Sequence, residues 1–211
     1  MKLILVRHGE TRLNKAGRVQ GINGEPLNAT GKAQAQAVAT ALADDLPFHL
    51  YASPLTRALE TAQTASDALR VPLATLNELR EADVGDLDGM TIPEIRERYP
   101  GFMERWAADS ATVPMPGGES LLQVQERAWP AIEKIVEKHP DDVVVVVTHN
   151  FVIQTLISKL LEMPLHRARS LRQELGSITR LDFSESRQSL VSLNETWHLR
   201  DIEPAKDDSA Q

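Results

Sequence analysis

Two histidines in this sequence stand directly after short apolar runs. His8 follows residues 3–6 and Arg7, while His149 follows the valine run 143–147 and Thr148. A neutral imidazole with one free ring nitrogen can act as a nucleophile or exchange a proton. An arginine beside it offers paired donors to phosphate or carboxylate oxygens and stays charged. Such a pattern is typical of a site that handles a phosphoryl group.

A second arginine, Arg57, falls in the first turn of a helix that we expect Ser53 and Pro54 to open, with Ser53 as its N-cap. A cation at this end opposes the helix dipole, which favours anions there. The simpler interpretation is a surface arginine paired with Glu60 or Glu78. A bound phosphate would remove the conflict, so we favour a functional role.

The same residues allow a different interpretation, a metal site made of His8, His149 and one carboxylate. Two arginines in the cluster argue against it, because they would repel a dication. We therefore expect no metal and no cofactor, and activity that survives a chelator would remove the metal interpretation. The remaining histidines are expected to be structural or exposed: His49, His139, His166 and His198.

Strands and helices alternate along the chain. Strands are expected at residues 3–6, 49–52, 71–76 and 143–147, with an antiparallel pair at 177–183 and 189–193. A first helix is expected at residues 31–45, with Thr30 as its N-cap, and a second begins after residue 54. Residues 92–106 should form two short helices divided by Pro100-Gly101. Two further helices are expected at residues 120–138 and 151–161. Residues 12–27 and 113–119 read as loops.

This alternation predicts one α/β domain in three layers, with a mainly parallel central sheet, helices on both faces and an antiparallel edge strand. We place the domain at residues 1–200 and expect the acidic tail, 201–211, to be disordered. Ligands of parallel sheets bind at the carboxyl ends of the strands. Arg7-His8, Ser53 with Arg57, and Thr148-His149 should therefore converge at one edge.

The composition limits the classes of partner that this chain is expected to bind. The net charge is −7 without a basic cluster, which disfavours nucleic acid as a ligand. No apolar run approaches the roughly 20 residues of a membrane helix, so we expect no membrane partner. The chain has no cysteine and no signal-peptide pattern, and we expect an unprocessed, cytoplasmic protein. A homodimer is left open.

Arg7-His8-Gly9-Glu10-Thr11 resembles the signature of the histidine phosphatase superfamily, also called the phosphoglycerate mutase-like family. The resemblance extends in order over nearly the whole chain, to about residue 195. The further matching positions are Asn14, Gln20-Gly21, residues 27–31 and 53–58, Glu81 with Gly85 and Gly89, Gly117-Gly118-Glu119-Ser120, and residues 146–149.

The resemblance implies roles for individual residues. His8 is similar to the nucleophile that forms a phosphohistidine, and Glu81 to the acid that protonates the leaving oxygen and then activates water. The rest of the phosphate site would be formed by Arg7, Arg57, His149, Asn14, Gln20, Gly21 and Asn150. Composition alone could not single out Glu81 among the acids of residues 78–89.

The resemblance implies a metal-independent phosphatase acting on a small phosphorylated metabolite, with a phosphoglycerate mutase as the alternative. Mutases of the family generally carry longer insertions than this 211-residue chain does, which favours the phosphatase. Val84 stands where some phosphoserine-specific relatives have histidine. An inactive phosphate-binding module is a third possibility, which the complete residue set argues against. Residues 90–118 and the chain end should build the leaving-group pocket, and Phe102, Met103, Trp106 and Met115 would either line it or form a small core.

Overall fold

The run of five valines forms the strand β4 in the interior of a six-stranded sheet. The computed structural model describes residues 1–184 and 187–202. Its strands are β1 (Lys2–Arg7), β2 (His49–Ala52), β3 (Leu73–Thr75), β4 (Val143–Thr148), β5 (Ile178–Ser184) and β6 (Arg187–Glu195). They lie in the order β3-β2-β4-β1-β5-β6. The first four are mutually parallel, while β5 runs antiparallel to β1 and to β6. The predicted α/β domain, with its antiparallel edge, is confirmed.

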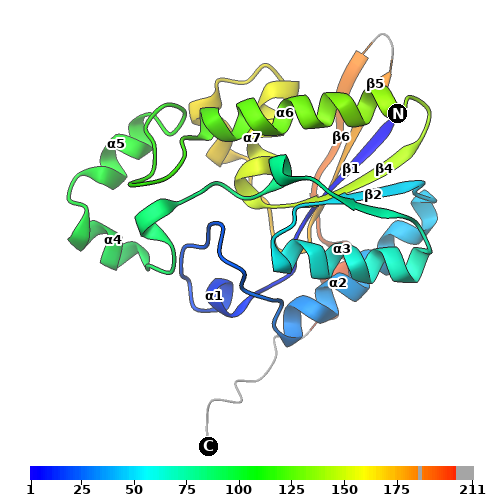
Figure 1. Ribbon diagram of the computed structural model, residues 1–211, viewed down its shortest axis with the longest axis horizontal. Coiled ribbons are helices and arrows are strands. Elements are labelled where there is room, and N and C mark those ends of the chain that lie inside the picture. Colours follow the sequence, from blue (N-terminus) through cyan, green and yellow to red (C-terminus); the bar gives the residue numbers. More distant parts are fainter. Residues whose placement is uncertain (185–186, 203–211) are drawn as a thin grey trace, which may run out of the picture.

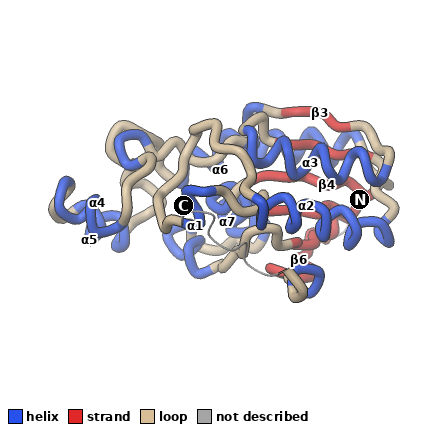
Figure 2. Tube along the Cα trace, turned by 90° about the horizontal axis from the view of Figure 1, so that it is seen from below, coloured by secondary structure: helices blue, strands red, loops and turns tan. Residues whose placement is uncertain are grey.

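Helices cover both faces of this sheet, as Figures 1 and 2 show. The helices are α1 (Arg12–Lys15), α2 (Ala29–Leu42), α3 (Thr56–Leu69), α4 (Ile92–Arg98), α5 (Phe102–Ala108), α6 (Leu121–Lys138) and α7 (Asn150–Leu160). Helices α2 and α3 lie on one face, and α6 and α7 on the other. Short 3-10 turns occupy Ala43–Asp45, Asn77–Leu79, Gly85–Leu87, Leu165–Ser170 and Trp197–Leu199.

Two cores follow from the alternation of side chains along the central strands. Leu3 and Leu5 of β1 belong to the core under α6 and α7, whereas Ile4 and Val6 belong to the core against α2 and α3. Successive strand residues point to opposite faces, so a strand covered on both sides must be apolar throughout. This requirement explains the unbroken valines of β4 and fixes its end at the edge where His149 follows.

Three local predictions were wrong in their details. Helix α2 begins two residues before the expected start, because Asn28, not Thr30, is its N-cap and accepts a hydrogen bond from the Gly31 amide. Helix α3 begins at Thr56 with Leu55 as N-cap, so Ser53 does not cap it. The predicted loop 12–27 contains the one-turn helix α1, which Thr11 caps.

The two pieces predicted for residues 92–106 are confirmed as α4 and α5. They are divided at Gly101, whose φ of +73° suits glycine. Both helices extend away from the sheet at one end of the molecule (Figure 1). A third apolar cluster holds them, comprising Val84, Leu87, Ile95, Phe102, Trp106 and Met115. This end of the molecule therefore has a core of its own.

In the described residues, no helix is long and apolar enough to cross a membrane. The expected disordered tail lies outside the described residues from position 203 onward. The boundary at residue 200 stays a prediction.

Candidate active site

His8 is held at the end of β1 by the sheet itself. Its backbone amide donates to the Thr148 carbonyl at 3.0 Å, which continues the pairing of β1 with β4, and the residue is 3% exposed. The ring Nδ1 lies 2.7 Å from the Gly9 carbonyl oxygen. A carbonyl can only accept, so Nδ1 carries the hydrogen and Nε2 keeps its lone pair. A neutral imidazole oriented in this way presents Nε2 as a nucleophile.

Gly9 is part of the same support. A Cβ at this position would lie 2.5 Å from the Gly31 carbonyl oxygen at the start of α2. Only glycine allows the strand-end loop and the helix to approach so closely. The carbonyl that orients His8 is therefore fixed by backbone packing.

Arg57 reaches His8 from the first turn of α3. Its Nε donates to His8 Nε2 at 3.2 Å, while Nη2 and Nη1 donate to the carbonyls of Gly21 and Asn23. The side chain is buried, and neither Glu60 nor Glu78 pairs with it, so the surface interpretation was wrong. Carbonyl groups of the loop before α2 therefore accept hydrogen bonds from guanidinium N–H groups of Arg57, which are donors of the kind that binds phosphate oxygens.

Arg7 supplies a second guanidinium at the same edge. Its Nη1 donates to the Gln173 carbonyl at 2.6 Å, and its buried Nε has no hydrogen-bond partner among the described residues. A buried donor without an acceptor is costly unless a ligand satisfies it. Arg7 thus offers a free donor at the strand end.

His149 caps α7 and faces His8, with ring centroids 5.1 Å apart. Its Nε2 lies 2.7 Å from Ser53 Oγ, which also accepts from the Leu55 amide. When Ser53 donates to Nε2, the neutral ring carries its hydrogen on Nδ1, the buried atom without a partner. Ser53, expected to cap a helix, instead orients His149.

Burial and charge set the protonation states of both imidazoles. Burial, followed by the charge of Arg57, holds the pKa of His8 and of His149 well below the ordinary 6.5. Burial also lowers the pKa of Arg57 to about 10, which leaves it cationic at neutral pH. The cluster therefore combines neutral imidazoles with cationic guanidiniums, a combination suited to a nucleophilic nitrogen beside a bound anion.

Glu81 is the buried carboxyl group beside this cluster. Its Oε1 accepts from the amides of Ala82 at 2.9 Å and Phe151 at 3.2 Å. Burial raises its pKa despite these hydrogen bonds and the charges of Arg57 and Arg7. Of the acids in residues 78–89, Glu81 is the buried one. A carboxyl group whose pKa is raised stays protonated to higher pH than a free one, which suits it to donate a proton.

Sequence reasoning did not identify the residue that fixes the backbone around Glu81. Arg127 of α6 donates to the carbonyls of Glu78 and Arg80 at 2.7 Å and of Glu81 at 2.9 Å. It also forms a bidentate pair with Glu119. An arginine in the middle of an amphipathic helix gives no signal of this role.

Glu119 completes the clamp from the Gly117-Gly118-Glu119 motif. Its Oε2 accepts from the Asp83 amide at 2.9 Å. A Cβ on Gly118 would lie 2.1 Å from the Asp83 carbonyl oxygen, so the two loops touch through their backbones. The Gly117-Gly118-Glu119 motif therefore has a structural role, because it fixes the position of the segment that carries Glu81.

The remaining predicted contacts lie nearby without a direct link to the two histidines. Asn14 accepts from Thr11 at the start of α1, and Gln20 accepts from Thr11 Oγ1 at 2.8 Å. Gly21 meets Arg57 through its carbonyl, and Asn150 accepts from Gln154. Their contacts with phosphate stay predictions.

A cavity of about 320 Å³ lies beside this cluster, and we call it the leaving-group cavity. Its lining consists of Val19, Leu87, Ile92, Ile95, Phe102, Met103, Trp106, Met115, Asn150, Phe151, Gln154 and Arg169. The four predicted apolar residues line it, and three of them also form the third core, so both interpretations hold. The chain end was expected to help build this pocket, but none of its described residues lines the cavity, because β6 pairs at the edge of the sheet. Arg169 lines the cavity instead.

The described residues contain no group of three or more histidine, aspartate or glutamate side chains placed to hold a metal ion. The carboxylate of Glu81 is directed to backbone amides, and Nε2 of His149 is directed to Ser53. Chemically, the arrangement offers a nucleophilic nitrogen, cationic donors and one proton donor around a small volume.

Comparisons with known proteins agree with this chemistry. The family model described as histidine phosphatase superfamily (branch 1) matches residues 3–196. Phosphoserine phosphatase 1 of Hydrogenobacter thermophilus is 33% identical over 199 residues, 94% of each chain. A probable phosphoglycerate mutase of Yersinia pestis is 31% identical over 186 residues, 88% of this chain and 86% of the mutase. A mycobacterial glucosyl-3-phosphoglycerate phosphatase solved with VO3 has a TM-score of 0.85 at 30% identity, covering 92% of this chain and 98% of that chain.

Proposed function

Because this chain belongs to branch 1 of the histidine phosphatase superfamily, we propose that it hydrolyses phosphomonoesters of small metabolites without a metal, through a phosphohistidine at His8. It is a phosphomonoesterase by its family and relatives. The observation that carries the proposal is the orientation of His8. Its Nδ1 is directed to the Gly9 carbonyl, and its Nε2 faces the guanidinium of Arg57.

In the first step, Nε2 of His8 attacks the phosphorus atom and the bond to the ester oxygen breaks. Protonated Glu81 donates its proton to the departing oxygen, so an alcohol leaves and no alkoxide forms. The guanidiniums of Arg7 and Arg57 neutralise charge on the phosphoryl oxygens. We propose the Nδ1–H of His149 as a further donor, since that buried atom has no partner among the described residues.

In the second step, the Glu81 carboxylate takes a proton from a water molecule that attacks the phosphohistidine. The P–N bond breaks, orthophosphate forms, and Nε2 recovers its lone pair. The upward shift of the Glu81 pKa suits both halves of this cycle, because it favours the protonated carboxyl in the first step and makes the carboxylate a stronger base in the second.

A panel of metabolite phosphates tests the proposal. It should include phosphoserine, glucosyl-3-phosphoglycerate and 3-phosphoglycerate, with p-nitrophenyl phosphate as a generic ester. We expect steady release of orthophosphate from several esters and equal rates with and without a chelator. Activity that a chelator abolishes and a divalent cation restores would contradict the metal-independent mechanism.

A phosphoglycerate mutase is the second candidate, supported by the similarity to the Yersinia pestis protein. That relative is matched over 86% of its length, so chain length does not separate the two activities. A mutase would use the same residues but return the phosphoryl group to its product. Isomerisation of 3-phosphoglycerate in the presence of a bisphosphate primer, with little orthophosphate released, would favour this candidate.

We place the enzyme in the cytoplasm, in agreement with a chain that has no cysteine to form disulfides. Fractionation of the source cells, followed by detection of the intact chain, tests this placement.

A further inference from the structure

The wall of the leaving-group cavity is almost entirely apolar. Among the described residues that line it, Arg169 is the one with a charge, and the polar members besides it are the amides Asn150 and Gln154. The aromatic rings of Phe102, Trp106 and Phe151 stand together there, with Trp106 and Phe151 edge to face at 5.9 Å between centroids. Such a surface suits an apolar or aromatic leaving group.

Arg169 lies over one of these rings. Its guanidinium carbon is 4.1 Å from the centroid of the Trp106 ring. A guanidinium held over an aromatic ring is attracted by the face of the ring, and this attraction uses none of its N–H groups, which remain available as donors. The contact with Trp106 therefore positions the cation without using its hydrogen-bonding capacity.

No protein anion in the described part of the chain satisfies Arg169: none of its side-chain N–H groups forms a hydrogen bond or an ion pair there. Partial burial lowers its pKa, and no neighbouring acid offsets that effect. This distinguishes it from Arg180, whose guanidinium is paired with both Asp45 and Glu195. A partly desolvated arginine without an acid is suited to an anion from outside the protein.

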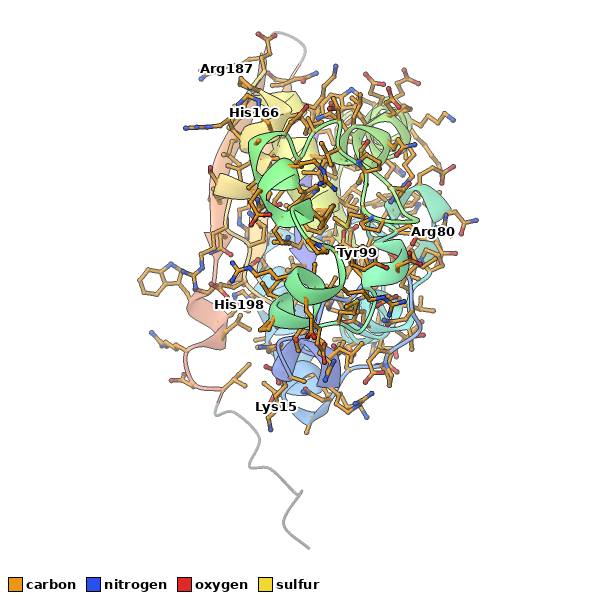
Figure 3. All side chains as sticks on the ribbon, turned by 90° about the vertical axis from the view of Figure 1, so that its left-hand side faces the viewer. Lys15, Arg80, Tyr99, His166, Arg187 and His198 are labelled. Carbon is orange, nitrogen blue, oxygen red and sulfur yellow. The ribbon has the colours of Figure 1, made fainter. Side chains whose placement is uncertain are left out.

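The segment that carries Arg169 is fixed in place. Ala168 is fully buried, and the carbonyl of His166 accepts from Ser110 Oγ at 3.4 Å, which links this segment to the chain after α5. Figure 3 views this end of the molecule, with Tyr99 of the α4 end in front and His166 above it. Arg169 is itself exposed, but these contacts fix the backbone that carries it at the cavity wall.

One end of the cavity lies next to the catalytic cluster. Phe151, in its lining, donates its amide to Glu81, and Asn150 directly follows His149. A leaving group bonded to phosphorus at His8 would place its ester oxygen near Glu81 and extend along the apolar wall. Its far end would then meet Arg169.

We propose that the preferred substrates are phosphate esters of alcohols with an apolar, ring-sized body and a carboxylate at the end remote from the phosphate, which Arg169 binds. This inference rests on the proposed phosphatase function and names its substrate class. Arginine matches a carboxylate through two parallel hydrogen bonds, whereas a neutral end would leave the guanidinium unpaired over Trp106.

Matched pairs of aryl phosphates test this inference. Each pair carries a carboxylate or the corresponding carboxamide on a chain of increasing length para to the phosphate, and kcat/KM is measured for both members. We expect the carboxylate to be favoured by about tenfold at the best chain length, as for one partly exposed charge-assisted pair. Arg169→Gln should reduce the carboxylate-to-carboxamide ratio of kcat/KM to about one. Arg169→Glu should instead favour an ester that carries an ammonium group in place of the carboxylate.

Arg167→Gln is the matched control, because Arg167 is exposed on the same segment and does not line the cavity; its ratio should equal that of the wild type. A wild-type ratio near one at every chain length, or a preference that survives Arg169→Gln, would overturn the inference. Failure to hydrolyse any ester, including p-nitrophenyl phosphate, would contradict the phosphatase instead. In that case, calorimetric binding of the carboxylate and carboxamide phenols to wild type and Arg169→Gln tests the cavity directly, and equal affinities would reject it.

Discussion

The phosphate cluster and the leaving-group cavity are built in different ways. His8, Arg57 and His149 stand at strand ends or helix starts and are fixed by hydrogen bonds to backbone and to one another. The cavity is formed largely by side chains of α4, α5 and the loops around them, packed on a small core. In the proposed mechanism, polar geometry sets the reaction, and apolar packing sets what can be attached to the phosphate.

This difference separates the effects that substitutions should have. A change in the cluster alters charge or orientation at the reacting atoms and should affect every ester alike. A change in the cavity wall removes contacts with one part of the substrate and should affect esters unequally.

Replacing the nucleophile should remove turnover of all esters. His8→Ala eliminates the nitrogen that we propose as the nucleophile, and we expect kcat to fall by at least about 10⁴-fold. Orthophosphate release from p-nitrophenyl phosphate and from an alkyl phosphate measures this. Circular dichroism should show an unchanged fold. Residual turnover within tenfold of the wild type would assign the attack to another group.

Glu81→Gln should discriminate by leaving group. The amide cannot donate a proton to the departing oxygen, so kcat/KM for alkyl phosphates should fall by about 10²–10⁴-fold. The loss should be much smaller for p-nitrophenyl phosphate, whose leaving oxygen needs little protonation. Equal losses for both esters would exclude a general-acid role.

The pH dependence follows from the direction of the Glu81 shift. A pKa above the usual 4.5 keeps the carboxyl protonated to higher pH, so kcat/KM for alkyl phosphates should decline as pH rises through that pKa. The pKa of His8 is held well below 6.5, so any acid-side decline caused by protonation of the nucleophile should lie at lower pH than for a free imidazole. A profile of kcat/KM against pH should lose its alkaline decline in Glu81→Gln and keep it in the wild type.

Arg127→Gln should have an intermediate effect through the position of Glu81. Without the clamp on three carbonyls, the carboxyl is less well aligned, and we expect kcat for alkyl phosphates to fall about tenfold with little change in KM. The fall for p-nitrophenyl phosphate should again be smaller. Lys134→Gln, on the exposed side of the same helix, is the control. A uniform loss for both esters, or a change confined to KM, would contradict a positioning role.

Met103→Ala should produce the smallest and most selective effect. Met103 is a partly buried side chain of the cavity wall, and its truncation removes apolar contact with the leaving group. We expect kcat/KM for esters with an apolar ring to fall by about three- to tenfold relative to a small alkyl phosphate. Leu161→Ala, an exposed apolar residue outside the cavity, is the comparison. An unchanged ratio would mean that the leaving group does not enter the cavity.

The same contrast explains what the sequence could predict. Strand ends were predictable because buried strands are uninterrupted apolar runs, and parallel strands end at one edge; this brought His8, Arg57 and His149 together. Helix starts were less predictable, since Asn28 and Thr30 are both able to cap, and Ser53 has a better partner in His149. Glu81 came only from the resemblance, because its burial depends on packing against α7.

Arg127 and Arg169 show a more general limit. Each acts on residues distant in the chain: Arg127 on the carbonyls of residues 78–81, and Arg169 on the ring of Trp106. No periodicity or local motif encodes such contacts, which arise only when loops are packed together. The atoms proposed to react were thus easier to predict from the sequence than the groups that position Glu81 or line the leaving-group cavity.

The central claim, a phosphoryl group carried on His8 Nε2, is tested most directly by trapping the intermediate. The enzyme is mixed rapidly with p-nitrophenyl phosphate, quenched under denaturing alkaline conditions that preserve phosphohistidine, and mapped by peptide mass spectrometry. We expect one phosphoryl group on the peptide that contains His8, lost on acid treatment and absent in His8→Ala. Turnover without any phosphorylated peptide, or a phosphoryl group on another residue, would contradict the mechanism.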